Sequence, residues 1–168
     1  MKKVLLSISL LIALHTTYSQ NRKVVVDKCI NKSEIYGPTG VICSNDNKTK
    51  WFTLTPVYKL DGTRLSTDEI IVIRMGIGDL SKEDQLFFSF TDGSKLRLES
   101  GCEATSEKII HFKLTELEFS IIKLKEIESV RYINGNDFSS FQYNMGESEK
   151  DYFTNLFTNY YIREVYCD

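Results

Sequence analysis

The stretch that most constrains this fold is residues 85–98, where two alternating apolar segments flank a Thr-Asp-Gly turn. Asp-Gly at a hairpin tip fits either a two-residue type I′ turn or a three-residue loop closed by a left-handed glycine. Because a shift of one residue moves a strand's whole apolar set to the opposite face, the two loops predict different pairings. The three-residue loop pairs Phe88 with Leu96 and Leu86 with Leu98, which puts the apolar residues on one side. We therefore predict this loop and a buried inner face.

The N-terminal 19 residues have the pattern of a secretory signal peptide. Two lysines precede an apolar run at residues 4–14, and a short stretch of small and polar residues ends at Ser19. The apolar run is too short to cross a bilayer, and no later stretch is long enough to do so. We expect cleavage after Ser19 and an exported chain, periplasmic or at the cell surface, in which residues 20–168 form one α+β domain.

Charge and composition restrict the possible partners. Removal of residues 1–19 takes away two lysines and no acidic residue, so the formal net charge falls from −2 to about −4. Nucleic acid binding requires a concentrated cationic face, so nucleic acid is not expected as a partner. Ten Phe and nine Tyr supply ample apolar surface for one packed core. A folded chain is expected rather than a disordered one.

Four cysteines lie in the predicted exported part, at Cys29, Cys43, Cys102 and Cys167. An even count in an oxidising compartment favours disulfides over metal or redox chemistry, and no pair has the C-x-x-C spacing. Four cysteines allow three connectivities, of which we prefer Cys29 with Cys43 and Cys102 with Cys167. The second bond would tie the C-terminal tail to the sheet. Free, buried cysteines are the alternative.

The other apolar segments predict strands separated by turns. Strands are expected near residues 22–30, 41–43, 51–60, 70–73, 108–112, 127–133 and 138–143. The run Ile70–Ile73 alternates least of all, which predicts a central strand covered on both faces.

Two helices are predicted after the hairpin. Thr115 and Glu118 have the spacing of a capping box, which places a short helix at about residues 116–124. Its apolar side chains at spacings of three and four are expected to face the core: Leu117, Ile121 and Leu124. A second helix is predicted at about residues 149–162, where an aromatic stripe would lie across the sheet. Together these elements predict an α+β fold with a mainly antiparallel sheet curled toward a half-barrel or sandwich.

The order of several segments also points to a family. The signal end Tyr18-Ser19-Gln20, the hairpin strand at residues 90–98, the helix start at 114–118 and the strand at 127–132 follow one another along the chain. With the terminal amphipathic helix, this order resembles small secreted β-rich proteins of Bacteroidota over about residues 85–162. The resemblance implies a bacterial, extracytoplasmic setting, and it carries no catalytic residues.

Few groups suit catalysis or metal binding. His111 is the one histidine left after removal of the signal, which argues against a multi-histidine metal site, and no metal or cofactor is expected. It lies between two apolar residues, as a strand residue would, and no serine lies in a Gly-x-Ser-x-Gly elbow. Two alternatives stay open: a cysteine nucleophile paired with His111, and acid pairs such as Asp68-Glu69 or Glu83-Asp84 acting as a glycosidase dyad.

No convergent catalytic set is visible, so no catalytic residue is predicted. We favour a non-catalytic binding or interaction module with a protein partner. A carrier of a small apolar ligand, held between the sheet and the C-terminal helix, is the second hypothesis. An enzyme that uses cysteine or acid chemistry is the third. The sequence names neither the partner nor the oligomeric state.

Overall fold

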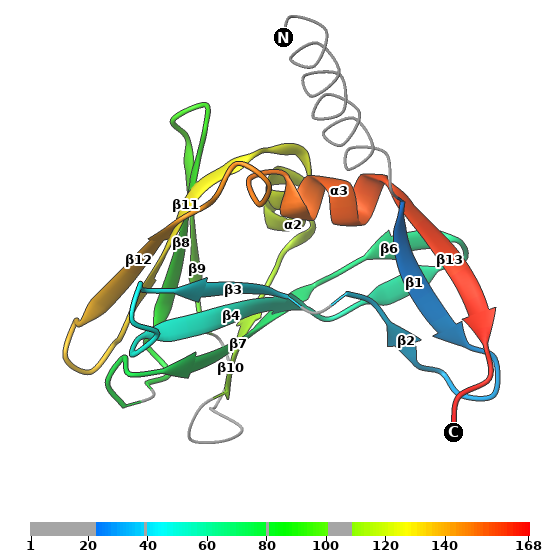
Figure 1. Ribbon diagram of the computed structural model, residues 1–168, viewed down its shortest axis with the longest axis horizontal. Helices are drawn as coiled ribbons and strands as arrows, with labels where there is room; N and C mark the ends of the chain where they lie inside the picture. The colour runs from blue at the N-terminus through cyan, green and yellow to red at the C-terminus, as the bar shows by residue number, and fades with distance from the viewer. Residues whose placement is uncertain (1–22, 39, 80, 101–108) are drawn as a thin grey trace, which may run out of the picture.

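Two four-stranded antiparallel sheets form the body of the protein in a computed structural model, which describes residues 23–38, 40–79, 81–100 and 109–168 (Figure 1). The first sheet has the order β10-β7-β4-β3, formed by Ile109–Lys113, Glu69–Met75, Trp51–Pro56 and Val41–Ser44. The second has the order β12-β11-β8-β9, formed by Ser140–Asn144, Ile127–Ile133, Gln85–Phe90 and Lys95–Glu99. An antiparallel bridge between Ser100 and Phe112 connects the β9 and β10 edges, and neither sheet closes into a barrel.

The hairpin of β8 and β9 has the predicted loop and register. Phe88 pairs with Leu96 and Leu86 with Leu98, as the three-residue loop requires. Gly93 lies at the tip with φ of 82°, a left-handed conformation that glycine adopts without steric cost. Four of the five inner-face side chains are no more than 1% exposed, so the buried inner face is confirmed.

Aromatic rings fill the space between the two sheets. The ring of Phe52 on β4 lies 6.0 Å from that of Tyr132 on β11 and 5.8 Å from that of Phe141 on β12. Phe112 on β10 meets the same Tyr132 ring edge-on at 6.4 Å. Such tilted and edge-on contacts suit the charge distribution of aromatic rings. The two sheets thus share one core, and the predicted sandwich-like α+β fold is confirmed.

Helix α2, Glu116–Leu124, begins at the predicted capping box. The backbone N–H of Glu118 donates to the Thr115 hydroxyl at 3.3 Å, and the Glu118 carboxylate accepts from the Thr115 N–H at 2.7 Å. These two bonds satisfy backbone donors that have no partner within the helix. The predicted position of this helix is therefore correct.

Helix α2 buries a different face from the predicted one. Phe119 and Ile122 are buried, whereas Leu117 and Leu124 are 71% and 68% exposed. The Phe119 ring meets Phe157 of helix α3 edge-on, with 4.9 Å between their centroids. Both sides of α2 carry apolar residues, so periodicity does not decide which side is buried. The larger apolar surface of the phenylalanine decides it.

The C-terminal helix is shorter than predicted, and a strand follows it. Helix α3 covers Tyr152–Thr158 instead of residues 149–162. Strand β13, Tyr160–Val165, then pairs in parallel with β1, Val24–Cys29. Tyrosine, isoleucine and valine favour strands, and pairing with β1 satisfies a row of backbone groups. Because of this long-range pairing, the helix ends at Thr158, and the aromatic residues that follow it belong to a strand.

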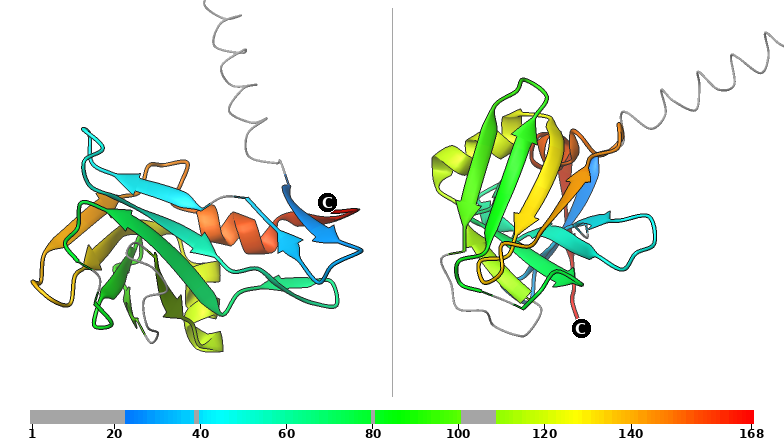
Figure 2. Two further views of the ribbon diagram at one scale, coloured as in Figure 1. Left: turned by 90° about the horizontal axis from the view of Figure 1, so that it is seen from below. Right: turned by 90° about the vertical axis from the view of Figure 1, so that its left-hand side faces the viewer.

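A small sheet and a hairpin extend from the body as an arm, which lies on the right in Figure 1 and again in the left view of Figure 2. The sheet has the order β13-β1-β2, with β2 at Ile35–Tyr36, and the hairpin consists of β5, Lys59–Asp61, and β6, Arg64–Ser66. The hydroxyl of Tyr160 accepts from the Leu65 N–H at 2.9 Å and donates to the Thr63 carbonyl at 3.0 Å, which links the sheet to the hairpin. Leu65 and Val26 are fully buried and continue the core of the body into the arm.

Candidate functional site

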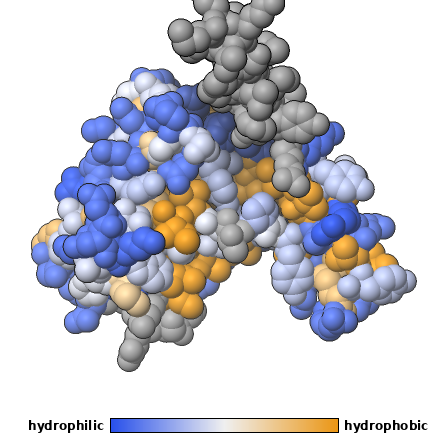
Figure 3. Space-filling view, viewed as in Figure 1, coloured by the Kyte–Doolittle hydropathy of each residue, from blue (hydrophilic) through white to orange (hydrophobic). Residues whose placement is uncertain are grey.

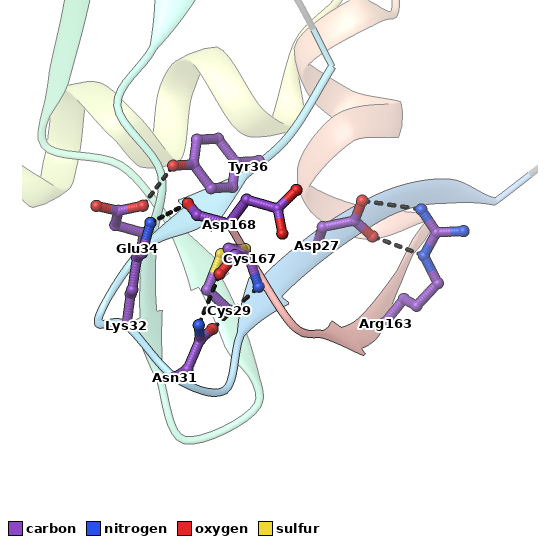
Figure 4. Close-up of a disulfide and its surroundings, with 9 residues drawn as sticks. All are labelled: Asp27, Cys29, Asn31, Lys32, Glu34, Tyr36, Arg163, Cys167 and Asp168. Atoms are coloured by element: carbon purple, nitrogen blue, oxygen red, sulfur yellow. Dashed lines mark hydrogen bonds and ion pairs between the residues drawn. A yellow bond between two sulfur atoms is a disulfide. The ribbon is translucent and has the colours of Figure 1, made fainter.

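A disulfide joins Cys29 to Cys167, so the predicted pairings of Cys29 with Cys43 and of Cys167 with Cys102 are wrong (Figure 4). Its Cα atoms are 5.6 Å apart across 138 residues of sequence. Cys29 ends β1 and Cys167 follows β13, so the parallel pairing of these strands brings the two thiols together. The Asn31 side chain accepts from the Cys167 N–H at 3.0 Å and donates to its carbonyl at 2.6 Å. The disulfide closes the end of the arm.

Cys43 is a free, buried cysteine, and Cys102 lies outside the described residues. Burial raises the pKa of the Cys43 thiol, which disfavours the thiolate that a nucleophile needs. Cys43 points into the core from β3. His111 lies on the outer face of the same sheet, on β10 at the far edge. A Cys43–His111 pair is therefore not formed.

The first acid pair does not converge on a shared site. Asp68 forms an ion pair with Lys59 at 2.6 Å. Glu69 contacts Lys113 and His111, each at 2.8 Å. Burial alone would raise the pKa of Glu69, but the hydrogen bonds and charges of Lys113 and His111 outweigh it and hold this pKa below its ordinary value. Each carboxylate therefore has its own basic partners, Lys59 for Asp68 and Lys113 with His111 for Glu69.

The second acid pair is split between the interior and the solvent. Asp84 is fully buried and accepts hydrogen bonds from the Tyr132 hydroxyl, from the Gly135 N–H at 2.7 Å and from the Ser81 N–H at 3.2 Å. Its neighbour Glu83 is exposed. A glycosidase dyad needs two carboxylates on one substrate space. Asp84 instead fixes the loops at this end of the body.

The outer face of the β10-β7-β4-β3 sheet carries large apolar side chains. Side chains alternate along strands, so the residues between core positions point outward. Six large apolar residues do so, and we call them the isoleucine face: Ile42, Trp51, Ile71, Ile73, Met75 and Ile109. Pairing places Ile73 opposite Ile109 and Trp51 opposite Met75, while Ile42 lies opposite Thr53 of β4, which separates it from the isoleucines of β7.

The isoleucine face is open to solvent. Ile42 is 62% exposed and Met75 45% exposed. Figure 3 shows a band of apolar residues running down this side of the body, over the strands that Figure 1 draws there. The strand β7 is central, as predicted, but Ile71 and Ile73 on its outer side are only half-buried, so coverage on both faces is wrong. Contiguous exposed apolar surface marks interaction sites.

In the part of the chain that the structure describes, no three His, Cys, Asp or Glu side chains are grouped so as to hold a metal ion. Within those same residues, no helix has both the length and the apolar character needed to cross a membrane. Comparison of the chain with protein-family models, with curated proteins and with solved structures finds no match.

Proposed function

We propose that this protein is an exported, non-catalytic binding module that docks a protein partner on the isoleucine face. The observation that carries the proposal is the group of large apolar side chains on one sheet face, which points away from a core already filled by aromatic rings. Keeping such a surface in water is unfavourable, and covering it with an apolar partner removes that cost.

The edge of the same sheet favours an extended segment as the part of the partner that binds. Strand β3 is the outermost strand of its sheet, and Ile42 stands on it. Among the described residues, β3 pairs with β4 alone. An incoming strand would bond to the free backbone groups of β3 and set alternate side chains beside Ile42. A partner with an apolar, sparsely charged strand fits both the edge and the face.

The packing of helix α3 disfavours the carrier hypothesis. Phe153 meets Phe88 of the sheet edge-on at 6.4 Å, and Phe157 meets Phe119 of α2 at 4.9 Å. Phe153 and Phe157 are each 1% exposed. Described side chains occupy the place where a small apolar ligand would lie, so the outer surface is the better candidate.

The proposal is tested by capture of exported proteins on immobilised residues 20–168, with variants of the face. Ile42→Lys and Met75→Lys each put a charge on the isoleucine face, and both are expected to abolish retention of the partner. Leu124→Lys is the matched control, because Leu124 is apolar and at least as exposed as Ile42 and Met75 but lies on α2. It is expected to retain the partner as the unmodified chain does.

Trp51 supplies a direct readout, because it is the chain's single tryptophan and belongs to the isoleucine face. Adding the captured partner is expected to shift its fluorescence to shorter wavelength as water leaves the ring. Retention that survives Ile42→Lys and Met75→Lys, or binding without a change at Trp51, overturns the proposal. So does sedimentation showing that a second copy of the chain covers the face.

A further inference from the structure

Strand β12 is an open edge of the second sheet. Among the described residues it pairs with β11 alone, and both Figure 1 and the right-hand view of Figure 2 show it at the outer side of its sheet. An edge strand presents a row of unpaired backbone groups that can pair with another chain. The hydrogen bonds to β11 show which residues of β12 present them.

The backbone groups of alternate β12 residues point away from β11. The Met145 N–H donates to the Glu128 carbonyl at 2.9 Å, and the Asn134 N–H donates to the Ser139 carbonyl at 2.8 Å. In an antiparallel pair, residues that bond to the partner strand alternate with residues that do not. The residues bonded to β11 are therefore the odd-numbered ones from 139 to 145. Three residues turn their N–H and C=O groups to the open side: Ser140, Gln142 and Asn144.

Strand β12 also carries no charged residue, unlike most of the other open edges. Its sequence is Ser-Phe-Gln-Tyr-Asn. Strand β9, at the opposite edge of the same sheet, carries Lys95, Arg97 and Glu99, and strand β13, at the edge of the arm, carries Arg163 and Glu164. Charged side chains on an edge keep it from pairing with other chains. Strand β3 is uncharged but has four residues against the five of β12, so β12 is the longest edge without this protection among the described strands.

The sequence of β12 complements itself when a second copy runs antiparallel to it. With a two-fold axis at Gln142, Ser140 lies opposite Asn144 of the other copy, and Phe141 lies opposite Tyr143. The three outward residues of each copy then fall in hydrogen-bonded pairs, which satisfies their backbone groups. Moving the axis by one residue in either direction leaves one outward residue of each copy without a strand partner. The strand thus has one best register with itself.

The paired side chains suit each other in this register. Phe141 and Tyr143 are half-buried on the inner face, and pairing sets each ring beside the other ring of the second copy. Aromatic pairs across neighbouring strands stabilise a sheet. On the outer face the two Gln142 amides meet at the axis, and no like charges are opposed. A second copy therefore supplies every complement that β12 requires.

We propose that two copies of the chain associate through β12 and join their second sheets into one continuous sheet. Such a contact is isologous, because the same residues supply both halves. It does not depend on the partner of the isoleucine face, which belongs to the other sheet. The contact involves one strand and its flanks from each copy, so the dimer is expected to be reversible.

An exposed ring beside the strand gains cover in the same dimer. Phe138 precedes β12 by two residues and is 78% exposed. Counting on in the register brings Gly146 of the other copy opposite Phe138. Glycine has no side chain, which leaves room for the ring. The dimer thus removes apolar surface from water as well as pairing two edges.

Sedimentation velocity of residues 20–168, over a series from micromolar to millimolar concentration, tests the proposal. The expected result is a reversible equilibrium between monomer and dimer. Gln142→Pro removes the N–H at the axis, where proline is tolerated because that N–H does not bond to β11. It should weaken the dimer by roughly tenfold or more, since each copy loses a backbone hydrogen bond. A chain that stays monomeric at millimolar concentration overturns the proposal.

Two control variants separate the strand contact from other surfaces. Gln142→Thr keeps the N–H and adds no charge, so it should dimerise as the unmodified chain does. Ile42→Lys puts a charge on the isoleucine face and should also leave the dimer intact. A dimer that persists in Gln142→Pro, or that is lost in either control, shows that the copies meet elsewhere. Thermal midpoints are compared first, so that an unfolded variant is not scored as lost association.

Disulfide cross-linking checks the register directly. The Cα atoms of a hydrogen-bonded antiparallel pair are about 5.5 Å apart, a distance that a disulfide can span. Gln142→Cys, in a Cys102→Ser background, is therefore expected to give a linked dimer on oxidation with diamide. Ser140→Cys in the same background is the matched control, because Asn144 and not Ser140 of the other copy lies opposite it. Cross-linking through Ser140→Cys but not through Gln142→Cys overturns the proposed pairing.

Discussion

At the residue scale, one lysine holds the tip of the central hairpin to a helix. Lys125 is the C-cap of α2, and its ammonium group donates to the Asp92 carboxylate at 2.7 Å and to the Ser94 hydroxyl at 2.8 Å. The Ser94 N–H also donates to Asp92, at 2.9 Å. The tip predicted as a turn is thus a structural junction between the hairpin and α2.

Because of these bonds, the contribution of the Asp92 carboxyl to the free energy of unfolding depends on pH in the acid range. The Lys125 bond, followed by those of Ser94, holds the pKa of Asp92 well below its ordinary value of 3.8. A carboxyl whose pKa is lowered by folding stabilises the protein at every pH above its unfolded value. That contribution is lost as the pH falls through the folded value. It is therefore complete at neutral pH and disappears only in strong acid.

Replacing Lys125 by methionine is expected to raise the pKa of Asp92 part of the way to its ordinary value, because the Ser94 bonds remain. Carbon-detected NMR titration of the carboxyl measures this shift. Lys50→Met removes a lysine that does not contact Asp92, so it serves as the control and should leave the pKa unchanged. A pKa that does not move in Lys125→Met would show that the ion pair is not formed in solution.

At the scale of elements, strand β13 depends on a long-range pairing and on the disulfide. It pairs with β1 residue by residue from Val24–Tyr160 to Cys29–Val165. The Arg163 guanidinium makes two bonds to the Asp27 carboxylate, at 2.7 and 2.8 Å (Figure 4). This ion pair is largely exposed, so it adds little stability. The disulfide is the stronger constraint on the strand.

Loss of the disulfide should destabilise the chain and release β13. A link across 138 residues contributes about 5 kcal/mol to the free energy of unfolding in the loop-entropy account. Cys167→Ser is expected to lower the urea midpoint and to speed amide exchange in β13. Cys43→Ala keeps the disulfide and should leave exchange in β13 slow. If β13 amides in Cys167→Ser remain as protected as before, pairing with β1 alone holds the strand.

Local signals explain which elements the sequence could predict. The hairpin loop and the α2 capping box depend on residues within four positions of each other, and both are correct. The aromatic residues after Tyr152 are compatible with either a helix or a strand. The partner that decides between them is strand β1, more than a hundred residues away in the sequence. The Cys29–Cys167 disulfide could not be predicted for the same reason, because no local pattern distinguishes the three possible connectivities of four cysteines.

The sequence signal at the candidate site predicts burial instead of an exposed face. The run Ile70–Ile73 predicts apolar side chains on both sides of one strand, and both sides are indeed apolar. One side faces the core and the other is the isoleucine face, which the pattern alone cannot separate.

At the scale of the whole molecule, the body and the arm share buried residues. Val26 of β1 and Leu65 of β6 are fully buried and belong to the same hydrophobic cluster as the aromatic rings between the sheets. Opening the arm would expose them together with part of the body. The chain is therefore expected to unfold in one cooperative transition.

Coincident urea midpoints are expected for Trp51 fluorescence, which reports on the body, and for hydrogen exchange of β1 amides, which reports on the arm. The unmodified, oxidised chain is the appropriate protein for this comparison. An earlier midpoint for the β1 amides would show that the arm opens as a unit of its own.

The parallel pairing of β1 and β13 also sets the order in which the chain is completed at the ribosome. Val24 emerges 136 residues ahead of its partner Tyr160. At translation rates of about 5–20 residues per second, β1 waits on the order of ten seconds for that partner. Through this interval its three consecutive valines lack their β13 partners, and an unpaired edge of this kind can pair with another chain. Among the strands that the structure describes, β13 is made last, and its pairing ends the exposure of β1.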